Sequence, residues 1–218
     1  MSLMKIHSYE LGHIGTNCYI ILPDGSDGAL VVDAPLEAAG FVPEFLRKRS
    51  RRLDAILLTH PHWDHIWDAA PLAAATGAKV YAAADAVDFI ENPQMQKARL
   101  SAPGDFPPAK VDVPVFDGER LEIDGVKITC LSVPGHCPGS VAYLMSDSEG
   151  ERVFVGDLLF NGSVGRTDFY GGSFEELERS IRGKIYALDD SVEVMPGHGP
   201  STTVGAERRS NPYVCDAR

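Results

Sequence analysis

The chain has 218 residues, of which 44% are hydrophobic, so we expect one globular domain over residues 1–218. Its net charge of −11 argues against nucleic-acid binding, which requires a basic surface. The sequence shows no membrane-length apolar segment and no signal-peptide pattern, so we expect a cytoplasmic protein that binds no membrane. The four cysteines form no C-x-x-C pair and are expected to be reduced thiols.

The first part of the chain alternates short apolar runs with segments of helical composition. Strands are expected at 18–22, 29–32, 54–58 and 79–82, and helices at 36–49, 66–76 and 85–91.

Residues 92–114 contain five prolines. Asn92 and Pro93 are suited to begin a short helix that ends near residue 100, and little regular structure is expected after it. Long loops in compact domains are often functional lids. The segment carries Lys97, Arg99 and Lys110, so it is either a cationic lid over an anionic substrate or a surface connection.

The second part of the chain is richer in strands. They are expected at 120–123, 127–133, 141–145, 152–155 and 191–195. Ser173 is a good N-cap for a helix over 173–188, because two glutamates follow in the first turn. A short helix is expected from residue 203.

A cluster of potential metal ligands follows the strand expected at 54–58. His60, His62, Asp64 and His65 form the pattern H-x-H-x-D-H, and imidazole and carboxylate groups suit zinc and similar divalent metals. In an extended segment, His60 and His62 point the same way. Such a coincidence arises by chance on the order of once in ten thousand chains of this length, so we predict a metal site.

Three further polar residues follow apolar strands in the same manner. His136, Asp157 and His198 each come after the end of a predicted strand, as His60 does. If these strands lie side by side, the polar side chains meet at one rim of the sheets. Asp33 also ends a strand, and it either orients a ligand histidine or occupies an ordinary turn.

This combination resembles the metallo-β-lactamase superfamily. The resemblance implies an α+β fold, the αββα sandwich, in which two mixed sheets are flanked by helices. It also implies two divalent metals. His60, His62 and His136 match the ligands of the first metal, Asp64, His65 and His198 match those of the second, and Asp157 matches the bridging carboxylate. Asp64 and Asp157 are the expected catalytic carboxylates. Zinc is the expected metal, with iron or manganese as alternatives.

Two motifs resemble the short bacterial glyoxalase II-like branch of this superfamily. They are Pro-Gly-His-Cys-Pro-Gly-Ser at residues 134–140 and Gly-Arg-Thr-Asp at residues 165–168. Persulfide dioxygenases share the second motif. In both groups its arginine lies near the substrate, so Arg166 is either a substrate-positioning residue or a partner of Asp168. Cys137 takes a position where the family usually has threonine, which favours packing over a redox or ligand role.

The sequence also departs from the family pattern in two ways. The family usually has a Gly-Gly pair where this chain has Trp67 and Asp68, and Trp67 is expected either to narrow the pocket or to pack in the core. The longer glyoxalase II enzymes have a C-terminal glutathione-binding domain that has no counterpart after His198. Recognition of glutathione therefore stays open.

These features predict a hydrolase that cleaves a thioester, similar to S-lactoylglutathione, with a metal-bridged hydroxide. The expected substrate is a small molecule, an anionic acyl-thiol. A thiolate leaves without strong acid assistance, because its reference pKa is about 8.5. The alternatives are a mononuclear iron persulfide dioxygenase, with His60, His136 and Asp157 as ligands, and a non-enzymatic metal-binding module.

Overall fold

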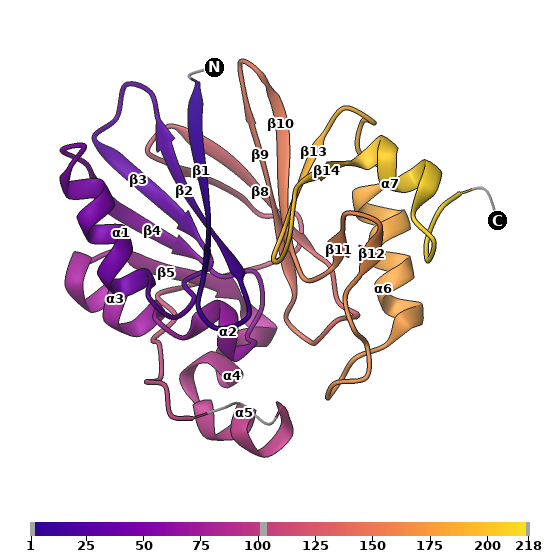
Figure 1. Cartoon of the computed structure of the whole chain (residues 1–218), viewed down its shortest axis with the longest axis horizontal. Helices are drawn as coiled ribbons and strands as arrows, with labels where there is room; N and C mark the ends of the chain where they lie inside the picture. The colour runs from indigo at the N-terminus through magenta and orange to yellow at the C-terminus, as the bar shows by residue number, and fades with distance from the viewer. Residues whose placement is uncertain (1–2, 101–103, 217–218) are drawn as a thin grey trace.

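The computed structural model describes residues 3–100 and 104–216, with the backbone alone described for residues 98–100. Two six-stranded sheets form its centre. Figure 1 shows these sheets face to face, with helices on their outer sides. This arrangement confirms the αββα sandwich and the α+β fold class implied by the sequence resemblance.

The first sheet has the strand order β1-β2-β3-β4-β5-β6. Strands β1 to β3 pair antiparallel, and β3 to β6 pair parallel. Every residue of β3 is buried, which is typical of a strand covered on both faces. The strands are β1 (Met4–Leu11), β2 (Thr16–Pro23), β3 (Gly28–Val32), β4 (Arg52–Leu57), β5 (Lys79–Ala83) and β6 (Val113–Val115).

The second sheet has the order β14-β13-β10-β9-β8-β7. Only β10 and β13 pair parallel in it, among the strands of the described ranges. A separate hairpin of β11 (Leu159–Phe160) and β12 (Ser163–Val164) follows β10. The sheet strands are β7 (Arg120–Ile123), β8 (Val126–Ser132), β9 (Val141–Asp147), β10 (Gly150–Gly156), β13 (Glu193–Pro196) and β14 (Thr202–Thr203).

Helices cover the outer face of each sheet. In Figure 1, α1 and α3 lie outside the first sheet, and α6 and α7 lie outside the second. No helix among the described residues has the length and apolarity needed to cross a membrane. The helices are α1 (Ala38–Arg47), α2 (Trp63–Ile66), α3 (Ala69–Thr76), η1 (Ala84–Ala86), α4 (Val87–Glu91), α5 (Pro93–Leu100), α6 (Phe174–Ser180), the π-helical turn η2 (Ile181–Ile185) and α7 (Val204–Ser210).

The main hydrophobic core lies between the two sheets. The ring of Tyr19 on β2 packs edge-on against Phe154 on β10, with 5.2 Å between ring centroids. The buried hydroxyl of Tyr143 on β9 donates a hydrogen bond of 2.9 Å to the carbonyl of Leu58, just after β4. These contacts fix the two sheets relative to each other, and therefore fix the loops at the strand ends.

One predicted helix begins later than expected. Of the segment 66–76, residues 69–76 form α3, whereas Ile66 ends the separate helix α2, and Trp67 and Asp68 lie between the two helices. The amide of Asp68 donates to the carbonyl of Ala34 at 2.9 Å, and its carboxylate accepts from the amide of Ala39 at 2.9 Å. The chain breaks here because Asp68 bonds to the segment around the start of α1 rather than continuing the helix.

The proline-rich segment is more regular than expected at its end. The helix expected after Pro93 is present as α5, but Val113 and Pro114 belong to strand β6, so the prediction of irregular structure there is wrong. Pro114 is tolerated because β6 lies at the edge of its sheet.

Candidate metal centre

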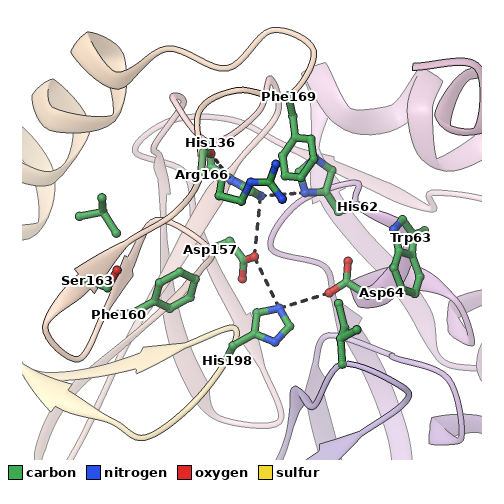
Figure 2. A pocket seen from close by; sticks show the side chains of 12 residues that line it. His62, Trp63, Asp64, His136, Asp157, Phe160, Ser163, Arg166, Phe169 and His198 are labelled. Atoms are coloured by element: carbon green, nitrogen blue, oxygen red, sulfur yellow. Dashed lines mark hydrogen bonds and ion pairs between the residues drawn. The ribbon is translucent and has the colours of Figure 1, made fainter. Parts of the chain in front are cut away.

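The predicted site residues are carried by the ends of four strands. His60 follows β4 of the first sheet, while His136, Asp157 and His198 follow β8, β10 and β13 of the second. The last three strands run in one direction, because β10 pairs parallel with β13 and β8 is related to β10 through two antiparallel pairings. Their ends therefore lie on one side, where Figure 2 shows His136, Asp157 and His198 close to His62 and Asp64.

The structure brings all seven predicted ligand residues together. Their donor atoms form three overlapping groups within 4.8 Å: His60, His62 and His136; His60, His65 and Asp157; and Asp64, His65 and His198.

Asp157 lies between the two ends of this cluster. Its Oδ1 is 3.3 Å from His65 Nε2. Its Oδ2 is 3.8 Å from His136 Nε2 and 3.5 Å from His198 Nε2. One carboxylate thus faces histidines from both predicted ligand sets, which is the position that a bridging ligand requires.

The buried donor atoms fit a divalent cation. Nε2 of His60 and His65 and Oδ1 of Asp157 are buried and have no hydrogen-bond partner among the described residues. Buried polar atoms are rarely left unpaired, because desolvation then goes uncompensated. Converging imidazole nitrogens and carboxylate oxygens are the donor set that zinc and related metals prefer.

Asp33 and Thr59 orient two of the histidines. The Thr59 hydroxyl donates to Asp33 Oδ2 at 2.8 Å, so its oxygen accepts from Nδ1 of His60 at 3.0 Å. Nδ1 of His65 donates to the same carboxylate at 2.7 Å. In both rings Nε2 keeps its lone pair for the centre. Of the two alternatives for Asp33, the structure therefore supports the one that orients a histidine.

Main-chain carbonyls orient two more rings. Nδ1 of His136 donates to the carbonyl of Arg166 at 2.7 Å, and Nδ1 of His198 donates to the carbonyl of Gly15 at 3.2 Å. Nε2 of each ring is again left as the metal-facing atom. His62 differs from the other four rings, because its Nδ1 faces the centre. This Nδ1 lies 2.7 Å from Nε2 of His136.

The electrostatics divide the histidines into two groups. Burial lowers the pKa of His60 well below its usual value, that of His62 to about 3, and that of His136 as well. These three rings are neutral at pH 7 and ready to bind a cation.

His65 and His198 show the opposite pKa shift. Burial alone would lower the pKa of His65, but the carboxylates of Asp64, Asp33 and Asp157 outweigh it and raise the pKa well above the usual value. The pKa of His198 is raised in the same way, against burial, by its hydrogen bond to Asp64. A metal bound here would therefore displace protons.

Thr16 is a site residue that sequence reasoning missed. It begins β2 in the first sheet, and its buried hydroxyl donates to Asp64 Oδ2 at 3.0 Å. The same oxygen of Asp64 lies 3.3 Å from His198 Nε2. Thr16 therefore holds a predicted ligand carboxylate in place.

Asn17 and Tyr19 were also missed. The side-chain amide of Asn17 donates to the carbonyls of Pro196 and Gly199 at 2.9 Å each, and the Tyr19 hydroxyl donates to Pro196 at 2.7 Å. These bonds fasten the segment that carries His198 to the opposite sheet. The sequence does show two polar residues, Thr16 and Asn17, at the start of an otherwise apolar strand. This pattern does not indicate which residues they contact.

A cavity of about 440 Å³ opens above the cluster. Arg166 lies on its lining, and its guanidinium pairs with Asp168 at 2.9 and 2.8 Å. The same guanidinium lies 4.4 Å from the ring centroid of Phe169. The expected partnership with Asp168 is thus present, at a position that also faces the cavity.

Two cations of the proline-rich segment, Lys97 and Lys110, pair with aspartates that do not line this cavity. Lys97 pairs with Asp105, and Lys110 pairs with Asp112 at 2.7 Å. The side chain of Arg99 lies outside the described residues. No residue between 92 and 114 is among the described residues lining this cavity.

The proline-rich segment also packs against the loop that carries His60 and His62. Gln96 of α5 is fully buried, and its side-chain amide donates to the carbonyl of Pro61, between His60 and His62. The Trp67 ring packs edge-on against Trp63, with centroids 5.7 Å apart, and at a tilt against Phe106, with centroids 5.3 Å apart. Trp67 thus packs in the core and is not among the described lining residues.

Cys137 has the surroundings of a packed thiol. Its Sγ is buried and lies 3.4 Å from the Ser140 hydroxyl, and burial raises its pKa to about 12. The thiol is therefore neutral at pH 7, in agreement with the expected packing role.

A relative and two solved structures resemble the chain over nearly its whole length. It is 34% identical to hydroxyacylglutathione hydrolase GloC of Haemophilus influenzae, over 97% of this chain and 98% of that protein. It superposes on the crystal structure of BLEG-1 B3 metallo-β-lactamase with a TM-score of 0.86 at 32% identity, over 97% of this chain and 99% of that one.

A further solved structure is that of TTHA1623 in a di-iron-bound form. It has a TM-score of 0.80 at 35% identity, over 95% of this chain and 99% of that one. The family model described as the metallo-beta-lactamase superfamily matches residues 11–198. Fold, site geometry and this match together show that the chain belongs to the metallo-β-lactamase superfamily.

Proposed function

We propose that the chain is a dinuclear metal-dependent thioester hydrolase of the glyoxalase II-like branch. The observation that carries the proposal is the convergence of five histidines and two aspartates, several with unpartnered buried donor atoms, at the floor of an open cavity. The likeness to a hydroxyacylglutathione hydrolase over nearly the whole chain supports the thioester assignment.

The donor positions support a proposal of two ligand sets. We propose His60, His62 and His136 for the first metal, Asp64, His65 and His198 for the second, and Asp157 for both. Zinc suits these nitrogen and oxygen donors. Iron is the principal alternative, because one similar structure is in a di-iron-bound form.

When bound, divalent metals at such a site lower the pKa of water and polarise a substrate carbonyl. The carboxylates of Asp64 and Asp157 have lowered pKa values, because the nearby imidazoles outweigh the opposing effect of burial. They are therefore ionised. Asp157 would serve as a ligand to both metals, and Asp64 would accept a hydrogen bond from the attacking water and orient its oxygen toward the carbonyl carbon.

The reaction forms a C–O bond, breaks the C–S bond and yields a carboxylate and a thiol. The thiolate needs no dedicated acid to leave, since its reference pKa is about 8.5. An amide nitrogen would need one, so a thioester suits these residues better than a β-lactam. Arg166, at the lining of the cavity, is positioned to hold an anionic part of the substrate.

Metal analysis combined with a thioester panel tests the proposal. We expect two metals per chain and hydrolysis of thioesters such as S-lactoylglutathione, in air and under anaerobic conditions alike. Removal of the metals with a chelator should abolish turnover, and reloading should restore it.

The two alternatives give different results in the same experiment. One iron per chain, oxygen uptake with a persulfide and no thioester turnover with any metal would identify a persulfide dioxygenase. Bound metal with neither activity would identify a metal-binding module. Either result overturns the proposed hydrolase.

A further inference from the structure

The walls of the cavity above the metal centre are apolar. They are formed by Ile14, Trp63, Phe160, Val164 and Phe169. Ile14 is 53% exposed, which is high for a large aliphatic side chain. Figure 2 shows Trp63 and Phe160 on opposite sides of the carboxylates of Asp64 and Asp157.

Contacts with the predicted ligands hold the aromatic walls in place. The Phe169 ring packs edge-on against His62, with centroids 5.3 Å apart. The Phe160 ring lies 6.2 Å from His198, and Trp63 is backed by Trp67. The apolar surface therefore starts directly beside the reacting centre.

The charges around the cavity do not match a substrate with several carboxylates. Arg166 is the one lysine or arginine among the described lining residues, and Asp168 already pairs with it. Lys97 and Lys110 pair with aspartates outside the lining, and the chain has a net charge of −11. Apart from the proposed metals, the side chains around the cavity therefore attract a polyanionic substrate only weakly.

We propose that this site selects thioesters with an apolar acyl group, either aromatic or of medium alkyl length, over the hydroxylated lactoyl group. The proposal rests on the thioesterase function proposed above. The acyl substituent and the thiol sulfur are both bonded to the reacting carbon and leave it in different directions. We place the acyl substituent between the apolar side chains of Trp63 and Phe160, and the thiol arm toward the rim at Arg166.

A series of acyl groups on one neutral thiol, N-acetylcysteamine, tests the proposal with the leaving group held constant. From acetyl to butanoyl we expect kcat/KM to rise about 4-fold per methylene, which corresponds to ~0.8 kcal/mol for each buried group. Phenylacetyl should exceed lactoyl by at least about 10-fold. Equal values across the series, or a preference for lactoyl over butanoyl, would overturn the proposal.

Variants of the cavity walls test whether these side chains cause the dependence of kcat/KM on acyl length. Phe160→Ala and Trp63→Ala should flatten the dependence on acyl length mainly through KM, with metal content and melting temperature checked for each. Phe116→Ala is the matched control, because Phe116 is 64% exposed and is absent from the described lining. A dependence on acyl length that survives in both wall variants would contradict the proposed location.

A binding experiment separates this inference from the proposed function. Calorimetry on the metal-loaded protein compares phenylacetate with acetate, two carboxylates that cannot be hydrolysed and that differ by an apolar ring on the acyl side. We expect phenylacetate to bind at least about 10-fold more tightly, and Phe160→Ala to remove that difference. If no thioester is turned over but this preference holds, the hydrolase proposal fails and the apolar pocket stands. Equal or tighter binding of acetate overturns the pocket proposal itself.

Discussion

Four of the five imidazoles in the cluster are aimed by a hydrogen bond to the nitrogen that faces away from it. Asp33 is central to this arrangement, because its carboxylate accepts from His65 and from both the amide and the hydroxyl of Thr59. Asp33 adopts a positive φ of 61°, a conformation that non-glycine residues seldom adopt. A strained residue that orients a ring is typical of a functional site rather than of an ordinary turn.

Replacing Asp157 with alanine should remove both metals or most of the second. The physical reason is that this carboxylate faces histidines from both ligand sets. Metal content by mass spectrometry and affinity by calorimetry measure the loss. Asp168→Ala is the control, since Asp168 is exposed and pairs with Arg166. An Asp157→Ala protein with two tightly bound metals and full activity would disprove the bridging role.

Replacing Asn17 with alanine should weaken the second metal about 10- to 100-fold, the range for residues that orient ligands. Without this amide, the carbonyls of Pro196 and Gly199 lose a donor, and the segment carrying His198 loosens. Titration of the metal-free protein measures the second binding constant. Asn161→Ala is a matched control, because its exposed amide bonds to the carbonyl of Ser201 nearby. Equal affinities in the two variants would refute the positioning role.

At the scale of elements, the site is built where strands end rather than within them. β10 and β13 run parallel, and the loops that follow them bring Asp157 and His198 together. Such an arrangement requires the two loops to approach closely. The amide of Gly197 donates to the carbonyl of Gly156 at 2.8 Å, which joins the loops at their first residues.

Gly197 is the tightest point of this approach, so Gly197→Ala should disrupt the centre. A Cβ there would lie 2.2 Å from Asp157 Oδ1 and 2.7 Å from Cε1 of His65. We expect loss of at least one metal and a stability decrease of about 1–3 kcal/mol from overpacking. Gly40→Ala is the control, because a Cβ on Gly40 in α1 meets nothing within 4 Å. Normal metal binding by Gly197→Ala would show that the loops separate more freely than this geometry implies.

At the scale of the whole molecule, the two sheets are joined by polar contacts as well as by the core. The side chain of Asp147, at the end of β9, is fully buried in the structure. It accepts hydrogen bonds from the main-chain amide of Met4 in β1 at 2.9 Å and from that of Glu149 at 2.8 Å, and it forms an ion pair with Arg152 at 3.1 Å. This carboxylate therefore links the edge strand of the first sheet to the second sheet.

Asp147→Asn should lower the free energy of unfolding by about 2 kcal/mol at pH 7, as expected for lost charge-assisted hydrogen bonds. Burial opposes ionisation, but the amides of Met4 and Glu149 outweigh it and hold the pKa of Asp147 below its usual 3.8. A lowered folded-state pKa stabilises the fold above pH 3.8, and this stability is lost as the pH falls through the folded-state pKa. Denaturant unfolding should thus show a difference between wild type and variant at pH 7 that shrinks at pH 3. A difference that is constant across this range would contradict the assignment.

Much of the fold was predictable from short-range patterns. The strands at 29–32, 120–123 and 141–145 match β3, β7 and β9 closely, because alternating or continuous apolar runs depend on local composition. The edge strand β1 was not predicted, since its residues alternate only partly between buried and exposed. The break between α2 and α3 was also missed, because it depends on bonds between Asp68 and the start of α1.

The sequence by itself determined which side chains are able to bind metal, because imidazole and carboxylate chemistry belongs to the residue and the H-x-H-x-D-H spacing is local. Only the tertiary structure decided what surrounds them. Asn17 is 179 residues from Pro196 in the chain, and no local pattern reveals such a partner. The apolar walls were equally hidden, because Ile14, Trp63 and Phe160 come from separate segments whose meeting depends on how the two sheets pack.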